Sequence, residues 1–155
     1  MKLNSVLTLL FIALFTACKG GAYDLSGYGL KPDTGENASP LIAKALQEIA
    51  AEVNSDTVRI LLPKGRYDFY PEGASKREYF ISNHDQDNPK LVGLAFENMK
   101  NVIFDGQGSE LVFHGRMLPV SLVGSENCTL KNFSIDFANP HISQVKVLEN
   151  DTVGG

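Results

Sequence analysis

The chain has 155 residues, and its 14 Lys and Arg against 18 Asp and Glu give a formal net charge of -4. A mildly acidic chain without a run of like charges is not expected to bind nucleic acid or an anionic membrane surface. The length leaves room for one domain, and 43% hydrophobic residues is an ordinary globular composition.

Residues 1–18 predict an export signal. Lys2 gives a short positive start, and residues 6–15 are apolar except for Thr8. This run is too short for a membrane-spanning helix, which needs ~20 apolar residues. It ends in small residues before Cys18, which resembles a bacterial lipoprotein signal. We therefore expect lipidation of Cys18, with ordinary cleavage of the signal or an incidental cysteine as the alternatives.

The mature part, residues 19–155, is predicted to begin with a helix. Ser39 suits the N-cap and Pro40 suits the first helical position. Apolar residues then recur at three- and four-residue spacing until about Asn54. This stripe, which we expect to cover one end of the core, consists of Leu41, Ile42, Ala45, Leu46, Ile49, Ala50 and Val53.

Short apolar segments after the helix predict strands, because Gly, Asn and Asp separate them. These segments are 57–62, 66–70, 79–81, 91–96, 101–104, 110–113, 120–123, 128–130, 133–137 and 144–148. The segments 94–106 and 120–132 are alike at an offset of 26 residues, which suits a stacked solenoid and is too short for a βαβ unit. The predicted fold class is all-β, a right-handed parallel β-helix with an N-terminal capping helix.

Two sets of motifs resemble known families. Residues 29–33, the predicted helix and residues 58–67 together resemble the opening of pectate-lyase-like β-helix proteins. A narrower resemblance lies in Ser75-Lys-Arg-Glu-Tyr-Phe-Ile-Ser-Asn-His-Asp-Gln-Asp-Asn-Pro-Lys90, Asn101-Val-Ile-Phe-Asp-Gly-Gln-Gly-Ser109, Phe113-His-Gly-Arg-Met117 and Asn132-Phe-Ser-Ile-Asp-Phe137. Together these resemble glycoside hydrolase family 110, the bacterial exo-α-1,3-galactosidases, above all the B-type enzymes of Bacteroides-like bacteria.

This resemblance implies hydrolysis of terminal α-1,3-linked galactose from linear and blood-group-B-like glycans, with inversion and without a metal or cofactor. It implies galactose-terminated glycans as partners. The lipoprotein-like signal adds the expectation of a lipid anchor as the only link to the membrane and of a place in the periplasm or outer membrane of a Gram-negative bacterium. A full-length protein could also assemble with copies of itself. Members of the family have several hundred residues, so we expect catalytic residues beyond Gly155. Residues 19–155 would then be an incomplete N-terminal part, inactive alone.

Inverting hydrolysis needs an acid and a base whose carboxyl groups lie ~6.5–9.5 Å apart, and the chain offers few candidates. Asp136 lies between Ile135 and Phe137, so in a strand it would point away from the core. It is either a catalytic carboxylate or a solvated one.

Two polar segments are candidates for contact with substrate. His84 and Asp85, with Asp87, lie in a polar loop that either contacts ligand or is structural. His114 and Arg116 follow a predicted strand and either line a sugar subsite or belong to a turn.

Other chemistry-bearing residues have structural interpretations. His84, His114 and His141 are spaced about one repeat apart, but without a paired ligand motif they do not predict a metal site. Residues 105–108 predict a tight turn, and Cys128 predicts a small buried core residue. The residues alone leave two other functions open: a non-catalytic carbohydrate-binding or adhesin solenoid, and a polysaccharide lyase.

Overall fold

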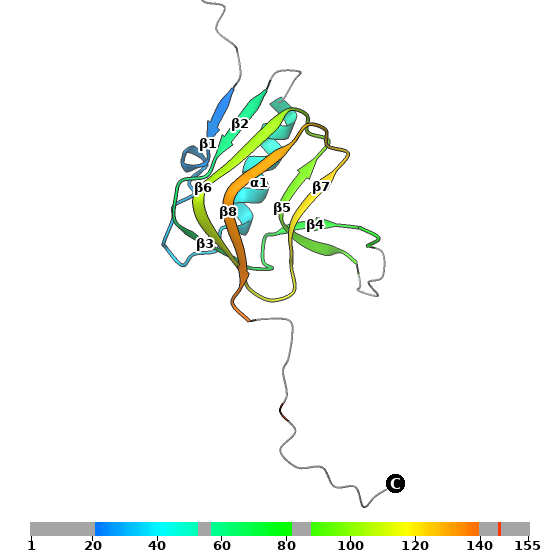
Figure 1. Cartoon of the computed structure of the whole chain (residues 1–155). Helices are drawn as coiled ribbons and strands as arrows, with labels where there is room; N and C mark the ends of the chain where they lie inside the picture. The colour runs from blue at the N-terminus through cyan, green and yellow to red at the C-terminus, as the bar shows by residue number, and fades with distance from the viewer. Residues whose placement is uncertain (1–20, 53–56, 82–87, 140–145, 147–155) are drawn as a thin grey trace, which may run out of the picture.

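A computed structural model describes residues 21–52, 57–81, 88–139 and 146. The described strands form two sheets, with one α-helix packed against them (Figure 1). The five-stranded sheet contains β1 (Ala22–Asp24), β2 (Val58–Leu61), β3 (Arg66–Phe69), β6 (Val102–Phe113) and β8 (Thr129–Phe137). The three-stranded sheet contains β4 (Ser75–Arg77), β5 (Lys90–Glu97) and β7 (Leu118–Val123). A short 3-10 helix, η1 (Leu25–Tyr28), precedes α1 (Ser39–Glu52).

Strand β6 organises the five-stranded sheet. Its first part pairs with β2, its second part pairs with β3, and β8 runs along its other edge, all in parallel. A bulge between Asp105 and Ser109 separates the two parts. Gln107 and Gly108 have positive φ there, 52° and 85°. The segment predicted as a turn between two strands is therefore a bulge inside one long strand.

The three-stranded sheet is mixed. Strand β5 pairs with β4 antiparallel and with β7 in parallel. The strand predicted at 79–81 does not form, because the residues that pair with β5 come earlier, in β4. Tyr79 instead donates its hydroxyl to Glu97 on β5 at 2.7 Å.

Helix α1 begins one position earlier than the sequence predicts. The carbonyl of Ala38 accepts from the amide of Ile42, so Ser39 lies inside the first turn and is not the N-cap. The side chain of Asn37 accepts from the amide of Ser39 at 2.9 Å. Ser39 is fully buried, and its hydroxyl donates to the carbonyl of Tyr70 at 2.7 Å, which ties the helix to the strand region after β3.

The core lies between the two sheets and α1. The rings of Phe96 on β5 and Phe104 on β6 meet edge to face with centroids 5.6 Å apart, which joins the sheets. Leu46 and Ile49 of the helix are buried, as the apolar stripe predicts. Leu41 is 37% exposed, so its expected place in the core was wrong.

The predicted right-handed parallel β-helix is contradicted. The strands form two separate, non-solenoidal sheets, and one of them contains the antiparallel pair β4–β5. Paired residues are not separated by one constant period: Ala22 pairs with Arg59, Val58 with Val102 and Ile103 with Thr129. The offset of 26 residues is present between β5 and β7 and between the first part of β6 and β8, whereas after the bulge Ser109 pairs with Phe133, an offset of 24. A single internal similarity of this kind does not establish a solenoid, which needs about three or more repeats.

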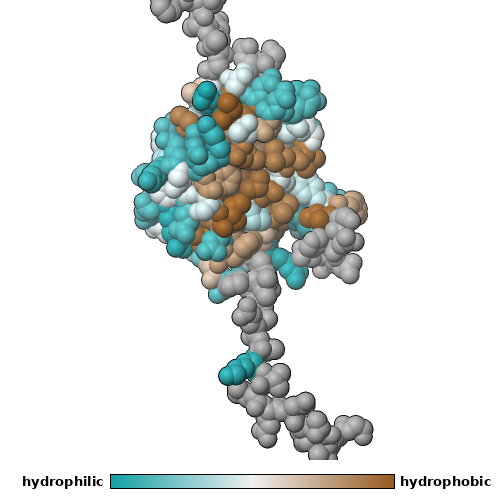
Figure 2. All heavy atoms as spheres, viewed as in Figure 1, coloured by the Kyte–Doolittle hydropathy of each residue, from teal (hydrophilic) through white to brown (hydrophobic). Residues whose placement is uncertain are grey.

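Apolar side chains gather on the face that carries β7 and β8, as Figure 2 shows. Leu122, Val123 and Ile135 are between 44% and 49% exposed there. Cys128 packs partly buried beside this face, so its expected place fully inside the core is only partly met. Among the described residues, no helix is long and apolar enough to span a membrane.

Candidate functional site

A polar cluster lies on the face of β3 opposite the core. Arg66, Asp68 and Tyr70 alternate along the strand with Tyr67 and Phe69, which are buried in the core. His114 follows β6 directly, and its amide donates to the carbonyl of Phe69 at 2.8 Å, which places it beside Tyr70. We call Arg66, Asp68, Tyr70 and His114 the Asp68 cluster.

The carboxylate of Asp68 is the centre of this cluster. Nε and Nη2 of Arg66 donate to its two oxygens at 3.1 and 2.8 Å, and Nε2 of His114 lies 2.8 Å from Oδ1. The hydrogen bonds from Arg66 are the main cause that holds the pKa of the Asp68 carboxyl below its usual value, and the contact with His114 adds to them against the effect of burial. Asp68 is thus an ionised acceptor at neutral pH, which suits an anchor and not a general acid.

The ring of Tyr70 stacks on the imidazole of His114. The ring centroids are 4.0 Å apart and the planes differ by 7°. Because Nε2 of His114 faces a carboxylate, a neutral imidazole there donates from Nε2 and leaves Nδ1 as an acceptor. The stack and the ion pair therefore fix both rings in orientation.

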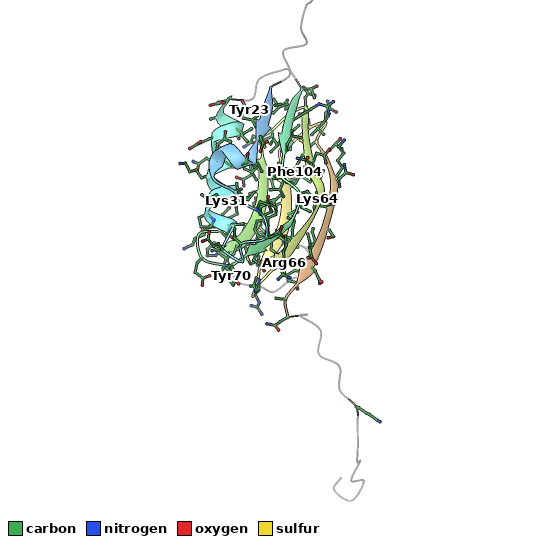
Figure 3. All side chains as sticks on the ribbon, turned by 90° about the vertical axis from the view of Figure 1, so that its left-hand side faces the viewer. Tyr23, Lys31, Lys64, Arg66, Tyr70 and Phe104 are labelled. Carbon is green, nitrogen blue, oxygen red and sulfur yellow. The ribbon has the colours of Figure 1, made fainter. Side chains whose placement is uncertain are left out.

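An open depression of about 430 Å³ lies at the cluster, lined by Asp33, Gly35, Arg66, Asp68, Tyr70 and His114. The loop before α1 forms its other wall. Asp33 is tied to β3, because its amide donates to the carbonyl of Arg66 and its side chain accepts from the amide of Arg66, both at 2.9 Å. Figure 3 shows Arg66 and Tyr70 toward the same end of the molecule.

Gly65 allows this loop to approach β3 closely. A Cβ at Gly65 would lie 2.3 Å from Cβ of Pro32, and the residue has a φ of 152°. A glycine is therefore required just before the cluster, and it holds the wall of the depression against the sheet.

Two of the sequence-predicted site residues, Arg116 and Asp136, are described and do not line this depression. His84, Asp85 and Asp87 lie outside the described residues, as does His141. Arg116 is exposed and is not part of the lining.

Asp136 is exposed on the outer face, as predicted, and lies two strands from Asp68 across Val112. Its Oδ1 accepts from the amide of Phe137 at 2.8 Å. Of the predicted candidates that the structure describes, His114 alone joins the cluster.

Arg66, Asp68 and Tyr70 are not among the site residues predicted from the sequence. A signal for them existed, because the segment 66–70 was predicted as a strand and polar residues at every second position share one face. Asp33 gave no comparable signal, since a contact across 33 residues of chain is not visible in a local pattern.

A second polar cluster links the strands of the three-stranded sheet to one another. Nε of Arg77 donates to the carboxylate of Glu97 at 2.7 Å, and Tyr79 contacts both Glu97 and Ser121. Burial is the main cause that raises the pKa of the Tyr79 hydroxyl. Within the part of the chain that the structure describes, no three His, Cys, Asp or Glu side chains come together as metal ligands would.

Comparison with known proteins gives a clear result, although no family model matches the chain. The chain is 60% identical over 149 residues to the alpha-1,3-galactosidase B of Parabacteroides distasonis, which covers 95% of this chain and 24% of that protein. It is 58% identical over 157 residues to the alpha-1,3-galactosidase B of Phocaeicola vulgatus, and the match covers 100% of this chain and 26% of that protein. The alpha-1,3-galactosidase A of Shewanella woodyi is 41% identical over 116 residues, and the match covers 75% of this chain and 18% of that protein.

The predicted resemblance to the α-1,3-galactosidases is confirmed. Identity is higher to these two B-type relatives than to this A-type one. The chain spans about a quarter of the length of the B-type α-1,3-galactosidases that it matches. The Asp68 cluster lies within the segment that matches this quarter of the relatives.

Proposed function

We propose that this chain is the N-terminal part of an exo-α-1,3-galactosidase, a hydrolase that removes terminal α-1,3-linked galactose from linear and blood-group-B-like glycans with inversion. The observation that carries this proposal is the 60% identity across 95% of the chain to a protein named alpha-1,3-galactosidase B. Identity at this level over almost the whole chain supports a shared role for the matched quarter.

The chemistry of the described residues supports a scaffold role for this part. An inverting hydrolase needs one carboxyl group that gives a proton and another that activates water. Asp68 is held as an anion by Arg66 and His114, and it has no freedom to give a proton at neutral pH. We place the catalytic carboxylates in the remaining three quarters of the longer enzyme.

Export and a lipid anchor at Cys18 belong to the same proposal. Cys18 lies outside the described residues, and the support is the short apolar run with small residues before the cysteine. The enzyme would then act at the periplasm or outer membrane of a Gram-negative bacterium, where glycans from outside the cell arrive.

A chimeric enzyme tests the proposal. The matched quarter of the Parabacteroides distasonis α-1,3-galactosidase B is replaced by this chain, and galactose release from α-1,3-galactobiose is measured. We expect the chimera to keep activity near that of the unmodified relative, because the two matched segments are 60% identical.

One control and one contrary outcome make the result interpretable. A chimera carrying Leu46→Asp places a charge in the core and should lose activity through misfolding, since Leu46 is 3% exposed. A soluble, folded chimera without galactose release would overturn the proposed function.

A further inference from the structure

The depression at the Asp68 cluster has features that the proposed catalysis does not use. Its volume of about 430 Å³ falls within the ~300–1,000 Å³ that is usual for ligand sites. It combines a stacked aromatic pair, Tyr70 and His114, with charged groups that are fixed by one another. A rigid polar lining of this kind costs little conformational entropy when a ligand binds.

Several polar groups at the depression have no hydrogen-bond partner among the described residues. They are the hydroxyl of Tyr70, Nδ1 of His114 and Nη1 of Arg66. Together they offer donors and acceptors around one open volume. A ligand with several neighbouring hydroxyl groups can use both kinds at once.

The charges of the lining favour a neutral ligand. Arg66 and Asp68 neutralise each other at 2.8 Å, and Asp33 adds a further carboxylate to the wall. Glu110, exposed, pairs in register with Arg66 on the same face of the sheet. An anionic ligand would therefore meet a slightly negative surface, which disfavours uronates and phosphates.

The aromatic pair adds an apolar surface to this polar lining. Tyr70 and His114 lie parallel, with an interplanar angle of 7°. Ligand sites typically combine an aromatic wall with a few fixed polar groups, and the wall accepts the apolar side of the ligand. A pyranose has such a side, formed by its C–H groups, and a rim of hydroxyl groups.

We propose that the depression lined by Asp33, Arg66, Tyr70 and His114 is an accessory subsite that binds a neutral sugar unit of the glycan, away from the bond that is cleaved. This inference rests on the proposed function for the class of sugar. It assigns one outer face of the Tyr70–His114 stack to the apolar wall, because the two rings cover each other's inner faces. Arg66 and Asp33 would contact the hydroxyl groups. Asp68 is a positioning residue that holds Arg66 and His114.

Binding measured without turnover tests the subsite. The full chain is titrated with α-1,3-galactobiose, and nuclear magnetic resonance signals of Tyr70 and His114 are followed. We expect saturable shifts centred on these two residues, with a dissociation constant in the millimolar range. A digalacturonate of the same size is the anionic probe and should bind more weakly.

A conservative pair of variants separates binding from folding. Tyr70→Phe keeps the stacked ring and removes only the hydroxyl group, so it should weaken binding by roughly two- to tenfold, the effect of one hydrogen bond. Tyr23→Phe removes a hydroxyl that donates to Glu52 away from the depression, and its affinity should equal that of the unmodified chain.

The subsite is overturned if galactobiose causes no shift at Tyr70 and His114, if Tyr70→Phe binds as tightly as the unmodified chain, or if the digalacturonate binds equally well. These outcomes are independent of the chimera assay, which measures galactose release. An active chimera together with a chain that does not bind would reject the subsite and leave the proposed function standing.

Discussion

The imidazole of His114 lies 2.8 Å from the carboxylate of Asp68, although 46 residues of chain separate them. The contact joins the end of β6 to β3 on the face opposite the core. Because Asp68 also receives two hydrogen bonds from Arg66, its charge is compensated where its side chain is only 7% exposed. The cluster therefore contributes to stability in a way that depends on pH.

Replacing Asp68 with Asn should destabilise the fold most at neutral pH. The pKa of Asp68 is lowered in the folded state from the ordinary value of 3.8, so its contribution is present above pH 3.8 and is lost as the pH falls through the lowered value. We expect Asp68→Asn to reduce the free energy of unfolding by about 2 kcal/mol at neutral pH, and by less in strong acid.

This difference is measured by denaturant unfolding of the unmodified and Asp68→Asn chains, once at neutral pH and once in strong acid. The control is Asp136→Asn, which changes an exposed carboxylate. Its free energy of unfolding should stay within about 0.5 kcal/mol of that of the unmodified chain. An equal loss at both pH values would show that the charge of Asp68 is not responsible.

The helix supports the core through Leu46 and not through Leu41. Leu46 is 3% exposed and Leu41 is 37% exposed. Leu46→Ala should lower the free energy of unfolding by ~2–5 kcal/mol, because it removes buried apolar volume. Leu41→Ala should lower the free energy of unfolding by clearly less than Leu46→Ala does. Equal thermal midpoints for the two variants would contradict the packing of α1.

The bulge in β6 should not tolerate a side chain at Gly106. A Cβ there would lie 2.6 Å from Cβ of Phe133 and 2.8 Å from the carbonyl oxygen of Asn132. We expect Gly106→Ala to lower the free energy of unfolding by ~1–3 kcal/mol, because the added methyl group overpacks the site. Gly27→Ala is the matched control, since nothing lies within 4 Å of its added Cβ. Thermal unfolding compares the two, and an unchanged midpoint for Gly106→Ala would mean that β8 shifts freely.

Local patterns predicted much of the secondary structure and little of its arrangement. The 3.6-residue period gave the helix and its buried face, and period-2 segments gave β2, β3 and β5. The residues at 105–108 and at 131–132 predict strand ends but lie inside β6 and β8, because a bulge and a turn use the same residue types.

The fold class failed for a different reason. One similarity at 26 residues was extended into a solenoid, while pairings such as Val58 with Val102 depend on long-range packing that no local pattern shows. The Asp68 cluster was missed likewise, since its members come from β3, the residue after β3 and the residue after β6.

Lipidation at Cys18 is tested by metabolic labelling. The unmodified chain, expressed in a Gram-negative host, should incorporate a labelled fatty acid, because the sequence before Cys18 resembles a lipoprotein signal. Cys18→Ala should not incorporate it, whereas Cys128→Ala should be labelled normally. Labelling that persists in Cys18→Ala would place the lipid elsewhere or reject the anchor.

The central claim is that this chain contributes a scaffold, while the catalytic carboxylates lie in the rest of a longer α-1,3-galactosidase. The most direct measurement is galactose release by the purified chain alone from α-1,3-galactobiose and from a branched B-type glycan, beside the Parabacteroides distasonis relative. If the chain is a scaffold, the relative should release galactose from both glycans and the chain alone should release none. Release by the chain that Asp136→Asn abolishes would contradict it and place the active site on β8.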